Sequence, residues 1–241
     1  MKSIQKKDKT FDFTDFEKGL MLAGYISPKS ELELSERAEL EEYEKQLEKE
    51  KSILFFKRSV LAAEITSKLY KEPTFGHVKL QKLMFLCEQV SHMEFNFNYS
   101  KQAAGPYDNK FMHSIDSSFE NQKWFKIIRV KSGDITIYTY SPSCSYGKHQ
   151  KYFEKYFSIC NDKIQWLINT FGMERTDKVE LIATLYACWL ELIENNTVVD
   201  ETNLLSLFYG WSESKLRFPE KMILRAIEWM KTKELFPKTI L

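Results

Sequence analysis

The side chains that could do covalent or metal chemistry are few and widely spaced in this sequence. The histidines are His77, His92, His113 and His149. None of them stands in a two-ligand helical motif such as His-Glu-x-x-His. The cysteines are Cys87, Cys144, Cys160 and Cys188. They lack the paired spacing of a zinc ribbon or of a thioredoxin-like site.

Two combinations of these residues were the nearest to a reactive site. Cys144, His149 and Cys160 could gather a metal ion, but their intervals match no common site. Cys87 and His92 are five residues apart, whereas helical neighbours lie three or four apart, so they form no nucleophile and base pair. Phosphate-binding glycine loops and a Gly-x-Ser-x-Gly elbow are absent from the sequence. We therefore predict no enzyme, with no catalytic or metal-binding residues and no cofactor.

Positive charge gathers at one predicted β-hairpin, on Lys123, Lys126, Arg129 and Lys131. Trp124 and Tyr138 could stack on bases beside these cations, as in a winged-helix DNA-binding module. Trp124 could equally fill the inner face of a hairpin that packs on helices. The 35 Lys and Arg nearly balance the 34 Asp and Glu, so no overall field draws the chain to nucleic acid. DNA binding through the hairpin is the alternative function.

Composition indicates a packed, water-soluble protein. The sequence is 43% hydrophobic and 15% aromatic, yet no run approaches the roughly 20 apolar residues of a membrane helix. The first residues carry a basic patch without the apolar stretch of a signal peptide. We expect a cytoplasmic protein without a membrane partner. Cys87 and Cys188 fall inside apolar helical patterns, where buried, reduced thiols are expected.

Residues 1–54 predict an N-terminal arm and a charged helix. The arm extends to Pro28, which blocks helix continuation, and Ser30 can then cap a helix that runs to about Lys51. The apolar positions of this helix are Leu40, Tyr43, Leu47 and Leu54. Their spacing resembles a coiled-coil seam that Glu50 interrupts, so a short pairing, and a dimer through this helix, is possible in principle.

Residues 55–241 predict one helical domain. Helices are expected at 55–70, 78–92, after Asp108, and at 148–171, 177–195, 200–209 and 218–233. Thr74 and Asp108 are expected to cap the helices that follow them. Trp124 to Tyr140 predicts a hairpin around Ser132-Gly133-Asp134. Phe95, Phe97 and Tyr99 alternate with polar residues, which predicts a half-buried strand in 93–104.

These elements define the fold class as mainly α. We predict a multi-helix domain with one wing-like β-hairpin, preceded by a charged N-terminal helical arm. The most informative stretch is Lys79-Leu80-Gln81-Lys82-Leu83, which opens an apolar helix and is followed by a predicted Gly105-Pro106-Tyr107 turn. Gly105 would adopt a conformation closed to bulkier residues. Lys79 and Lys82 could also be the solvent-exposed edge of their helix.

Residues 74–125 resemble the Panacea (SocA-type) antitoxin domain and the C-terminal toxin-binding module of DarG-like antitoxins. Both families carry a lysine-rich start to an apolar helix and a later Gly-Pro-Tyr-like turn. Further similar stretches are Glu180 to Tyr186, Trp211 to Phe218 and Ile227 to Met230. The resemblance covers about residues 55–237. A similar module is appended to specificity subunits of type I restriction systems.

The resemblance implies a non-enzymatic interaction module, which binds a toxin or a subunit of a bacterial restriction or anti-phage defence complex. No macrodomain accompanies the module here, so the ADP-ribose hydrolase activity of DarG is not implied. The family-motif and candidate partner-binding residues are Lys79, Gln81, Lys82, Gly105, Pro106, Tyr107, Phe111, Trp124, Trp211 and Lys215. Among these, the candidate anchors Tyr107, Phe111, Trp124 and Trp211 could equally be core residues.

Overall fold

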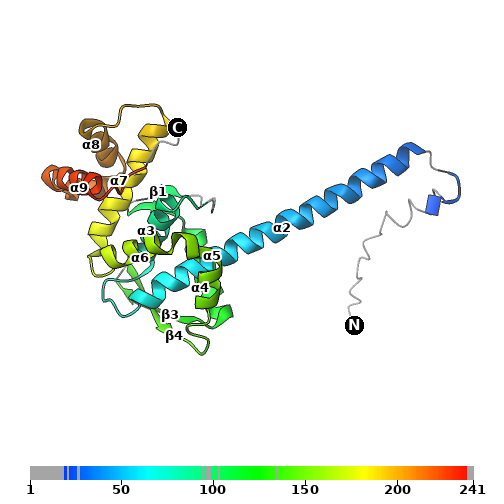
Figure 1. Cartoon of the computed structure of the whole chain (residues 1–241), viewed down its shortest axis with the longest axis horizontal. Coiled ribbons are helices and arrows are strands. Elements are labelled where there is room, and N and C mark those ends of the chain that lie inside the picture. Colours follow the sequence, from blue (N-terminus) through cyan, green and yellow to red (C-terminus); the bar gives the residue numbers. More distant parts are fainter. Residues whose placement is uncertain are drawn as a thin grey trace, which may run out of the picture. The chain divides into compact units, whose positions relative to one another are not determined.

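The computed structural model describes residues 19–20, 22–25, 28–93, 95, 99–102, 104–133 and 135–237. The chain divides into two compact units, Met1–Ile53 and Leu54–Leu241, beside the expected boundary between residues 54 and 55. The described residues are mainly helical and include a β-hairpin, as predicted (Figure 1).

The helices are α2 (Pro28–Leu69), α3 (His77–Val90), α4 (Asn109–Gln122), α5 (Gln150–Phe157), α6 (Asn161–Phe171), α7 (Thr176–Glu194), α8 (Glu201–Gly210) and α9 (Glu220–Thr232). Two short 3-10 helices, η1 (Ser158–Cys160) and η2 (Glu213–Arg217), lie between them. The strands are β1 (Ser100–Gln102), β2 (Gly105–Tyr107), β3 (Phe125–Ser132) and β4 (Ile135–Pro142). In the part of the chain described here, no helix is long and apolar enough to cross a membrane.

Helix α2 is continuous where the sequence predicted two helical stretches, and it begins at Pro28 instead of after Ser30. A proline is tolerated in the first turn because the N–H that it lacks would have no helical partner there. Leu40, Tyr43 and Leu47 are exposed. Further along, the helix buries an apolar face that includes Val60 and Ile65.

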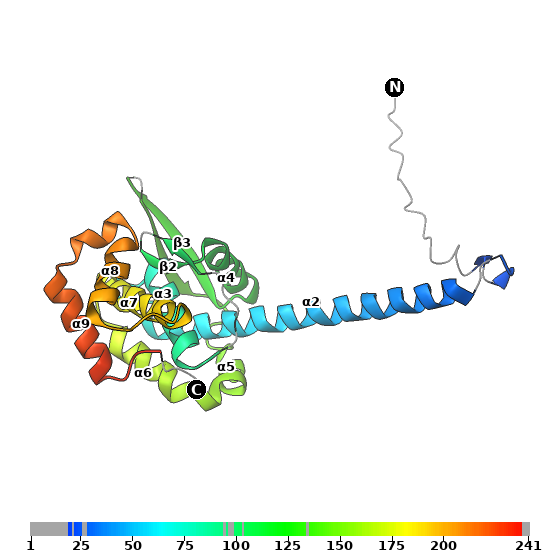
Figure 2. The same ribbon diagram turned by 90° about the horizontal axis from the view of Figure 1, so that it is seen from above.

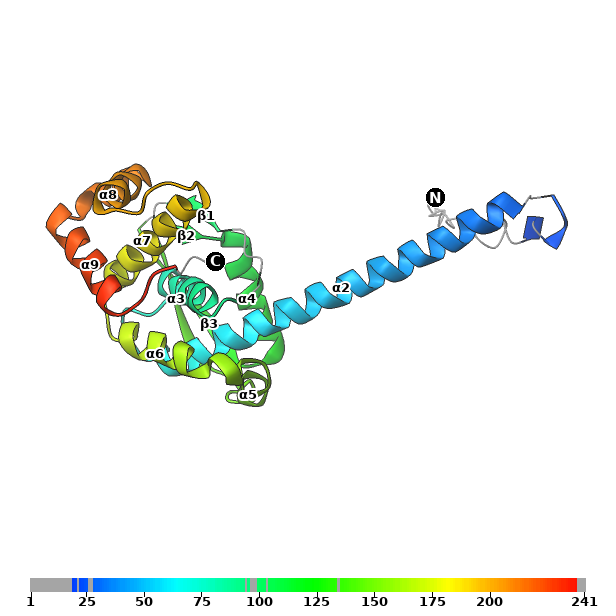
Figure 3. The same ribbon diagram turned by 45° about the horizontal axis from the view of Figure 1, so that its top comes forward.

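Helices α3 and α7 pack against each other at the centre of the second unit, and α6 also packs on α3 (Figure 3). Most residues of α3 and more than half of those of α7 are buried, so both helices contribute extensively to the core. Cys87 and Cys188 are buried and free, as the sequence predicted. Burial raises the pKa of both thiols, that of Cys188 to about 12.

The predicted helix caps had different outcomes. Asp108 caps α4, because its carboxylate accepts a hydrogen bond from the Phe111 N–H at 2.9 Å, as predicted. The cap predicted at Thr74 is wrong. Helix α3 begins at His77, so Gly76 is its N-cap residue and Thr74 lies too early in the chain. The Thr74 hydroxyl accepts a hydrogen bond from Lys79 Nζ at 3.0 Å instead.

The predicted hairpin is present as β3 and β4, which pair antiparallel from Phe125↔Pro142 to Ser132↔Ile135. A second antiparallel pair joins β1 to β2, with Gln102 opposite Gly105. The turn predicted at Gly105-Pro106-Tyr107 is therefore wrong, because these residues form strand β2. Proline is tolerated there since an edge strand need not use every N–H. Among the described residues of the stretch predicted as a strand, Ser100–Gln102 pairs, and Phe97 lies outside the described residues.

The helix predicted at 148–171 is interrupted, since η1 separates α5 from α6. Its apolar spacing continues across the break from Phe157 to Ile164, which is why the sequence period does not reveal it. The last predicted helix starts two residues late, at Glu220. Pro219 restricts the backbone of Phe218 to an extended conformation, which the structure shows as φ −89° and ψ 117°.

Candidate functional site

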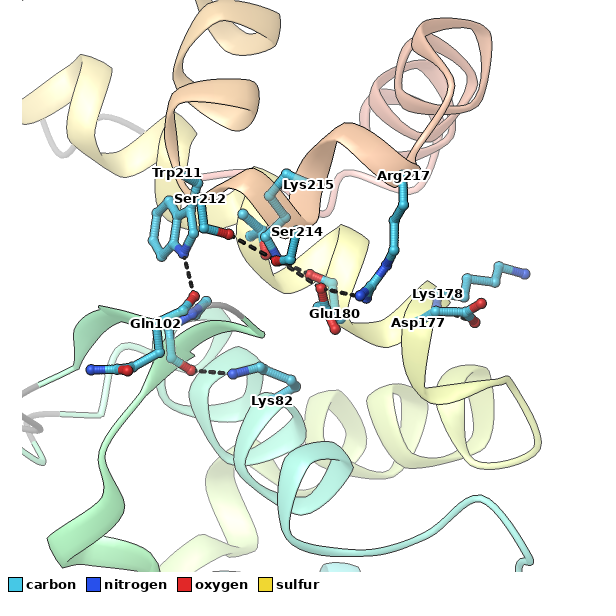
Figure 4. Close-up of polar contacts among 12 residues, drawn as sticks. Lys82, Gln102, Asp177, Lys178, Glu180, Trp211, Ser212, Ser214, Lys215 and Arg217 are labelled. Carbon is cyan, nitrogen blue, oxygen red and sulfur yellow. Dashed lines mark hydrogen bonds and ion pairs between the residues drawn. The ribbon is translucent and has the colours of Figure 1, made fainter. Parts of the chain in front are cut away.

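Residues from separate stretches of the sequence converge around Glu180 of α7 (Figure 4). We call this group the Glu180 cluster, and it consists of Lys82, Pro106, Glu180, Lys215 and Arg217. Lys82 comes from α3, Pro106 from β2, and the other two cations from η2. The cluster therefore connects the elements that carry the family motifs.

The carboxylate of Glu180 holds the two cations of η2. Its Oε1 accepts hydrogen bonds from Lys215 Nζ at 2.7 Å and from Arg217 Nη2 at 2.9 Å. Lys215 is 0% exposed, whereas half of the Arg217 side chain reaches solvent. Burial lowers the pKa of Lys215, and the hydrogen bond and charge of Glu180 oppose that shift. Glu180 is thus the counter-ion that keeps a buried ammonium charged.

Lys82 is the second buried lysine of the cluster. It is 0% exposed, and its Nζ donates a hydrogen bond to the carbonyl of Pro106. Burial lowers the pKa of Lys82 to about 7, against the opposing charge of Glu180 and with the help of Lys215. The interpretation of Lys79 and Lys82 as a solvent-exposed helix edge is therefore wrong, because α3 is covered on the side that carries both lysines.

Gly105 lies where no larger residue fits. Its φ is +93°, and a Cβ built on it would stand 2.6 Å from Thr184 Oγ1 and 3.5 Å from Lys82 Cε. The Thr184 hydroxyl is itself fixed, since it donates to the Glu180 carbonyl at 2.7 Å. The predicted backbone role of Gly105 is confirmed by this positive φ, and close packing adds a second requirement.

Trp211 connects the end of α8 to strand β1. Its Nε1 donates to the Gln102 carbonyl at 2.9 Å (Figure 4). Lys101 Nζ lies 5.3 Å from the centre of the Trp211 ring. Lys101 also pairs with Glu191 at 2.7 Å. Trp211 is partly exposed, so it can both hold β1 in place and meet a partner.

Lys79 and Gln81 serve internal contacts. Lys79 is 0% exposed, and its Nζ donates to the carbonyls of Gly172 at 2.5 Å and Glu174 at 2.6 Å, just after α6. A cation is favourable there because the last carbonyls of a helix carry negative partial charge. Burial lowers the pKa of Lys79. Gln81 Nε2 donates to the Asp108 carbonyl at 3.1 Å, which places the start of α4.

The aromatic candidates are divided between core and surface. Phe111 and Trp124 are buried in the hydrophobic core, which is the position of a packing residue and not of a surface anchor. The side chain of Tyr107 lies outside the described part of the structure. Trp211 alone among the four anchors is described as reaching solvent.

Two histidines form buried contacts with carboxylates. His149 Nε2 lies 3.3 Å from Glu64 Oε2, and His77 Nε2 lies 3.0 Å from Asp116 Oδ1. The trio of Cys144, His149 and Cys160 does not assemble. Over the described ranges, no three His, Cys, Asp or Glu side chains are grouped so that they could hold a metal ion.

Sequence reasoning missed the roles of Glu180, Thr184 and Arg217. Glu180 carried a signal that could have been used, because it is an acidic residue directly between Val179 and the apolar run Leu181-Ile182-Ala183 of one helix. A buried carboxylate requires a buried cation or several hydrogen bonds, so it predicts a partner elsewhere in the chain. The partner itself could not be identified from spacing.

Comparison with protein-family models and with curated proteins gives no match. The resemblance to the Panacea and DarG-like modules therefore remains an expectation from the sequence motifs alone, and among the residues of those motifs Lys82, Pro106, Glu180 and Lys215 lie in the Glu180 cluster.

Replacing Lys82 with methionine should change how stability depends on pH. The folded pKa of about 7 lies below the unfolded value near 10.5, so the unfolded chain binds more protons between these pH values. Wild-type stability from this group should rise with pH in that window, by no more than roughly 1.4 kcal/mol per pH unit, and should level off below pH 7, where the lysine is protonated in both states. Urea unfolding of both proteins at pH 6 and pH 9 checks this. Between pH 6 and pH 9, the free energy of unfolding of the wild type should rise relative to that of the variant. The same pH dependence in both proteins would contradict this prediction.

Proposed function

We propose that this chain is a non-enzymatic, antitoxin-like interaction module, which neutralises a partner toxin by direct binding or serves as a subunit of a bacterial restriction or anti-phage complex. One observation supports this most: motif stretches far apart in the sequence meet in one buried cluster around Glu180. Such convergence is expected if these stretches form a single module, as they do in the families that they resemble. We place this activity in the cytoplasm.

Inhibition would be steric. A helical body of this kind can cover the active site of an enzyme, and a standard interface buries roughly 1,600 Å² in total. The surface has a groove with apolar side chains that could take part in such a contact. A groove of about 610 Å³ lies between α7 and α9, with Leu181, Phe218 and Trp229 in its lining and charged residues beside them.

Co-expression with the product of the adjacent open reading frame tests this function. We expect the chain to restore growth of cells that the neighbouring product inhibits, and to co-purify with it in a defined ratio. An unrelated helical protein expressed at the same level is the control. Unrestored growth together with no complex in size-exclusion chromatography would refute the proposal.

DNA binding is the second candidate, because Lys123, Lys126 and Lys131 are exposed at the hairpin. Its expected stacking faces are occupied. Trp124 is buried, and the Tyr138 ring stacks on His77 with 3.5 Å between ring centres. The hairpin therefore offers charge to a phosphate backbone without free aromatic faces from these two residues.

We also propose that two copies associate through the first part of α2, where Leu40, Tyr43 and Leu47 are exposed at short coiled-coil spacing. Replacing Leu40 and Leu47 with glutamate should then convert a dimer into a monomer, because like charges would face each other across the seam. Sedimentation velocity over a range of concentrations measures this. An unchanged sedimentation coefficient would exclude the dimer through α2, and Ser52→Glu on the exposed part of the same helix is the control.

A further inference from the structure

One face of the β3–β4 hairpin carries nothing that covers it among the described residues. The residues of this face, here named the outer hairpin face, are Lys126, Ile128, Val130, Ile137, Thr139 and Ser141. They alternate along each strand with residues that face the helices, such as Phe125 and Tyr140, which are buried. The hairpin extends beyond the helices of its own unit (Figure 2).

The outer hairpin face is more apolar than a solvent-exposed face of a β-hairpin usually is. Ile128 is 47% exposed, Val130 is 52% exposed and Ile137 is 49% exposed. Val130 and Ile137 are directly paired across the strands, and Ile128 lies diagonally from Ile137, so the three side chains form one patch. The solvent face of an antiparallel pair is usually polar. A contiguous β-branched patch on it indicates a contact surface.

Charge restricts what can occupy this surface. Lys126 borders the patch on the same face, and Lys123 is exposed just before β3, whereas the exposed Lys131 alternates onto the opposite face. Asp134 is the only acidic residue between positions 123 and 142. A second copy packed on this face would bring like charges together, which disfavours self-association here. An acidic partner would be attracted.

The apolar patch also favours a protein over nucleic acid as the partner of this face. A phosphate backbone gains from the lysines but nothing from three exposed β-branched side chains, while Trp124 is buried and one face of the Tyr138 ring stacks on His77. We propose that the outer hairpin face binds a protein segment whose apolar side chains are bordered by Asp and Glu. This inference deepens the proposed interaction function and depends on it for its biological meaning.

Designed peptides test the surface directly. Two fluorescent peptides of about 18 residues share one leucine stripe, and the stripe is bordered by glutamates in one and by lysines in the other. Fluorescence anisotropy with the full chain should show binding of the glutamate peptide and none of the lysine peptide. Ile137→Glu should weaken binding by at least about tenfold, because it removes an apolar contact and adds repulsion.

Two variants keep the test selective. Ile159→Glu is the matched control, since Ile159 is fully exposed on η1 away from the hairpin, and binding should be unchanged. The double variant Val130→Thr and Ile137→Thr keeps the β-branched shape of both side chains. It therefore still tests the patch if the glutamate variant does not fold. It should also lose affinity. Equal binding of both peptides, or binding that neither hairpin variant alters, would overturn the proposal.

The same titration with a labelled DNA duplex separates the other outcome. Tighter binding of the duplex than of the glutamate peptide, sensitive to Lys126→Ala and not to the threonine variant, would overturn the protein assignment in favour of DNA. The antitoxin function has a separate test. If the adjacent gene product is neither neutralised nor retained but the peptides bind as expected, the antitoxin function is refuted and the binding surface is not. Retention of that product by the Ile137→Glu variant at wild-type affinity would reject the hairpin surface alone.

Discussion

Replacing Gly105 with alanine is expected to lower the free energy of unfolding by about 2–6 kcal/mol. A non-glycine residue at φ +93° is strained, which costs roughly 1–3 kcal/mol. The added Cβ would stand 2.6 Å from Thr184 Oγ1, and overpacking of this kind typically costs about 1–3 kcal/mol more. Urea unfolding followed by circular dichroism measures the sum.

Gly210 provides the matched control for this prediction. It ends α8 at an ordinary φ, and a Cβ there would meet nothing within 4 Å. Gly210→Ala should therefore leave stability unchanged or raise it by up to about 1 kcal/mol. Adding Thr184→Ala to Gly105→Ala should recover only the steric part of the loss, since the backbone strain remains. Equal stability of the two single glycine variants would show that Gly105 is not under the constraint described.

Replacing Glu180 with glutamine is expected to lower the free energy of unfolding by roughly 3–5 kcal/mol at pH 6. Glutamine keeps the volume of the side chain but leaves buried Lys215 without a carboxylate, along with the half-exposed Arg217. Without Glu180, the folded pKa of Lys215 should drop further below its unfolded value. The loss should therefore shrink as pH rises toward 9, because Lys215 can then be neutral in the folded state.

A surface pair controls for the removal of a carboxylate. Glu201 and Lys231 lie 3.4 Å apart, and each is about half exposed. Glu201→Gln should change stability by no more than about 1 kcal/mol. The double variant Glu180→Leu and Lys215→Met should recover much of the loss of Glu180→Gln, since it removes a buried charge together with its counter-ion. If Glu180→Gln unfolded at the same urea concentration as Glu201→Gln, the contacts of Glu180 with Lys215 and Arg217 would not stabilise the fold.

Local signals in the sequence were enough for the elements and their main connections. Asp108 could be identified as a cap because its carboxylate acts on a backbone N–H only a few residues away. The β3–β4 hairpin could be predicted from Lys131-Ser132-Gly133-Asp134, whose glycine adopts the positive φ that a tight hairpin needs. Both inferences use interactions within a few residues.

The fate of the lysines could not be predicted in this way. Lys79 and Lys82 look like ordinary polar positions on α3, and only distant segments decide that they meet carbonyls instead of water. Gly172 lies 93 residues from Lys79 in sequence, a separation at which periodicity carries no information. The same holds for Glu180 and Lys215, which are 35 residues apart.

The candidate contact residues show a related limit. Phe111 and Trp124 have the side chains of interface anchors, but large aromatic residues fill cores equally well, and their burial became clear only in the structure. The hairpin strands carry apolar residues on both faces, so the sequence could not tell which face meets the helices. Tyr140 and Phe125 pack inward, and Ile128 and Val130 consequently remain outside.

The position of η2 near the C-terminal end has a consequence for biosynthesis. Lys82 and Pro106 leave the ribosome long before Lys215 and Arg217, so Glu180 has no counter-ions from η2 while the chain is still being translated. In products that end before η2, Glu180 would lack these counter-ions and apolar residues of α7 would be exposed. Quality-control proteases recognise exposed apolar segments of this kind. Only a chain that includes η2 can close the cluster, so products that end before Lys215 are expected to be degraded.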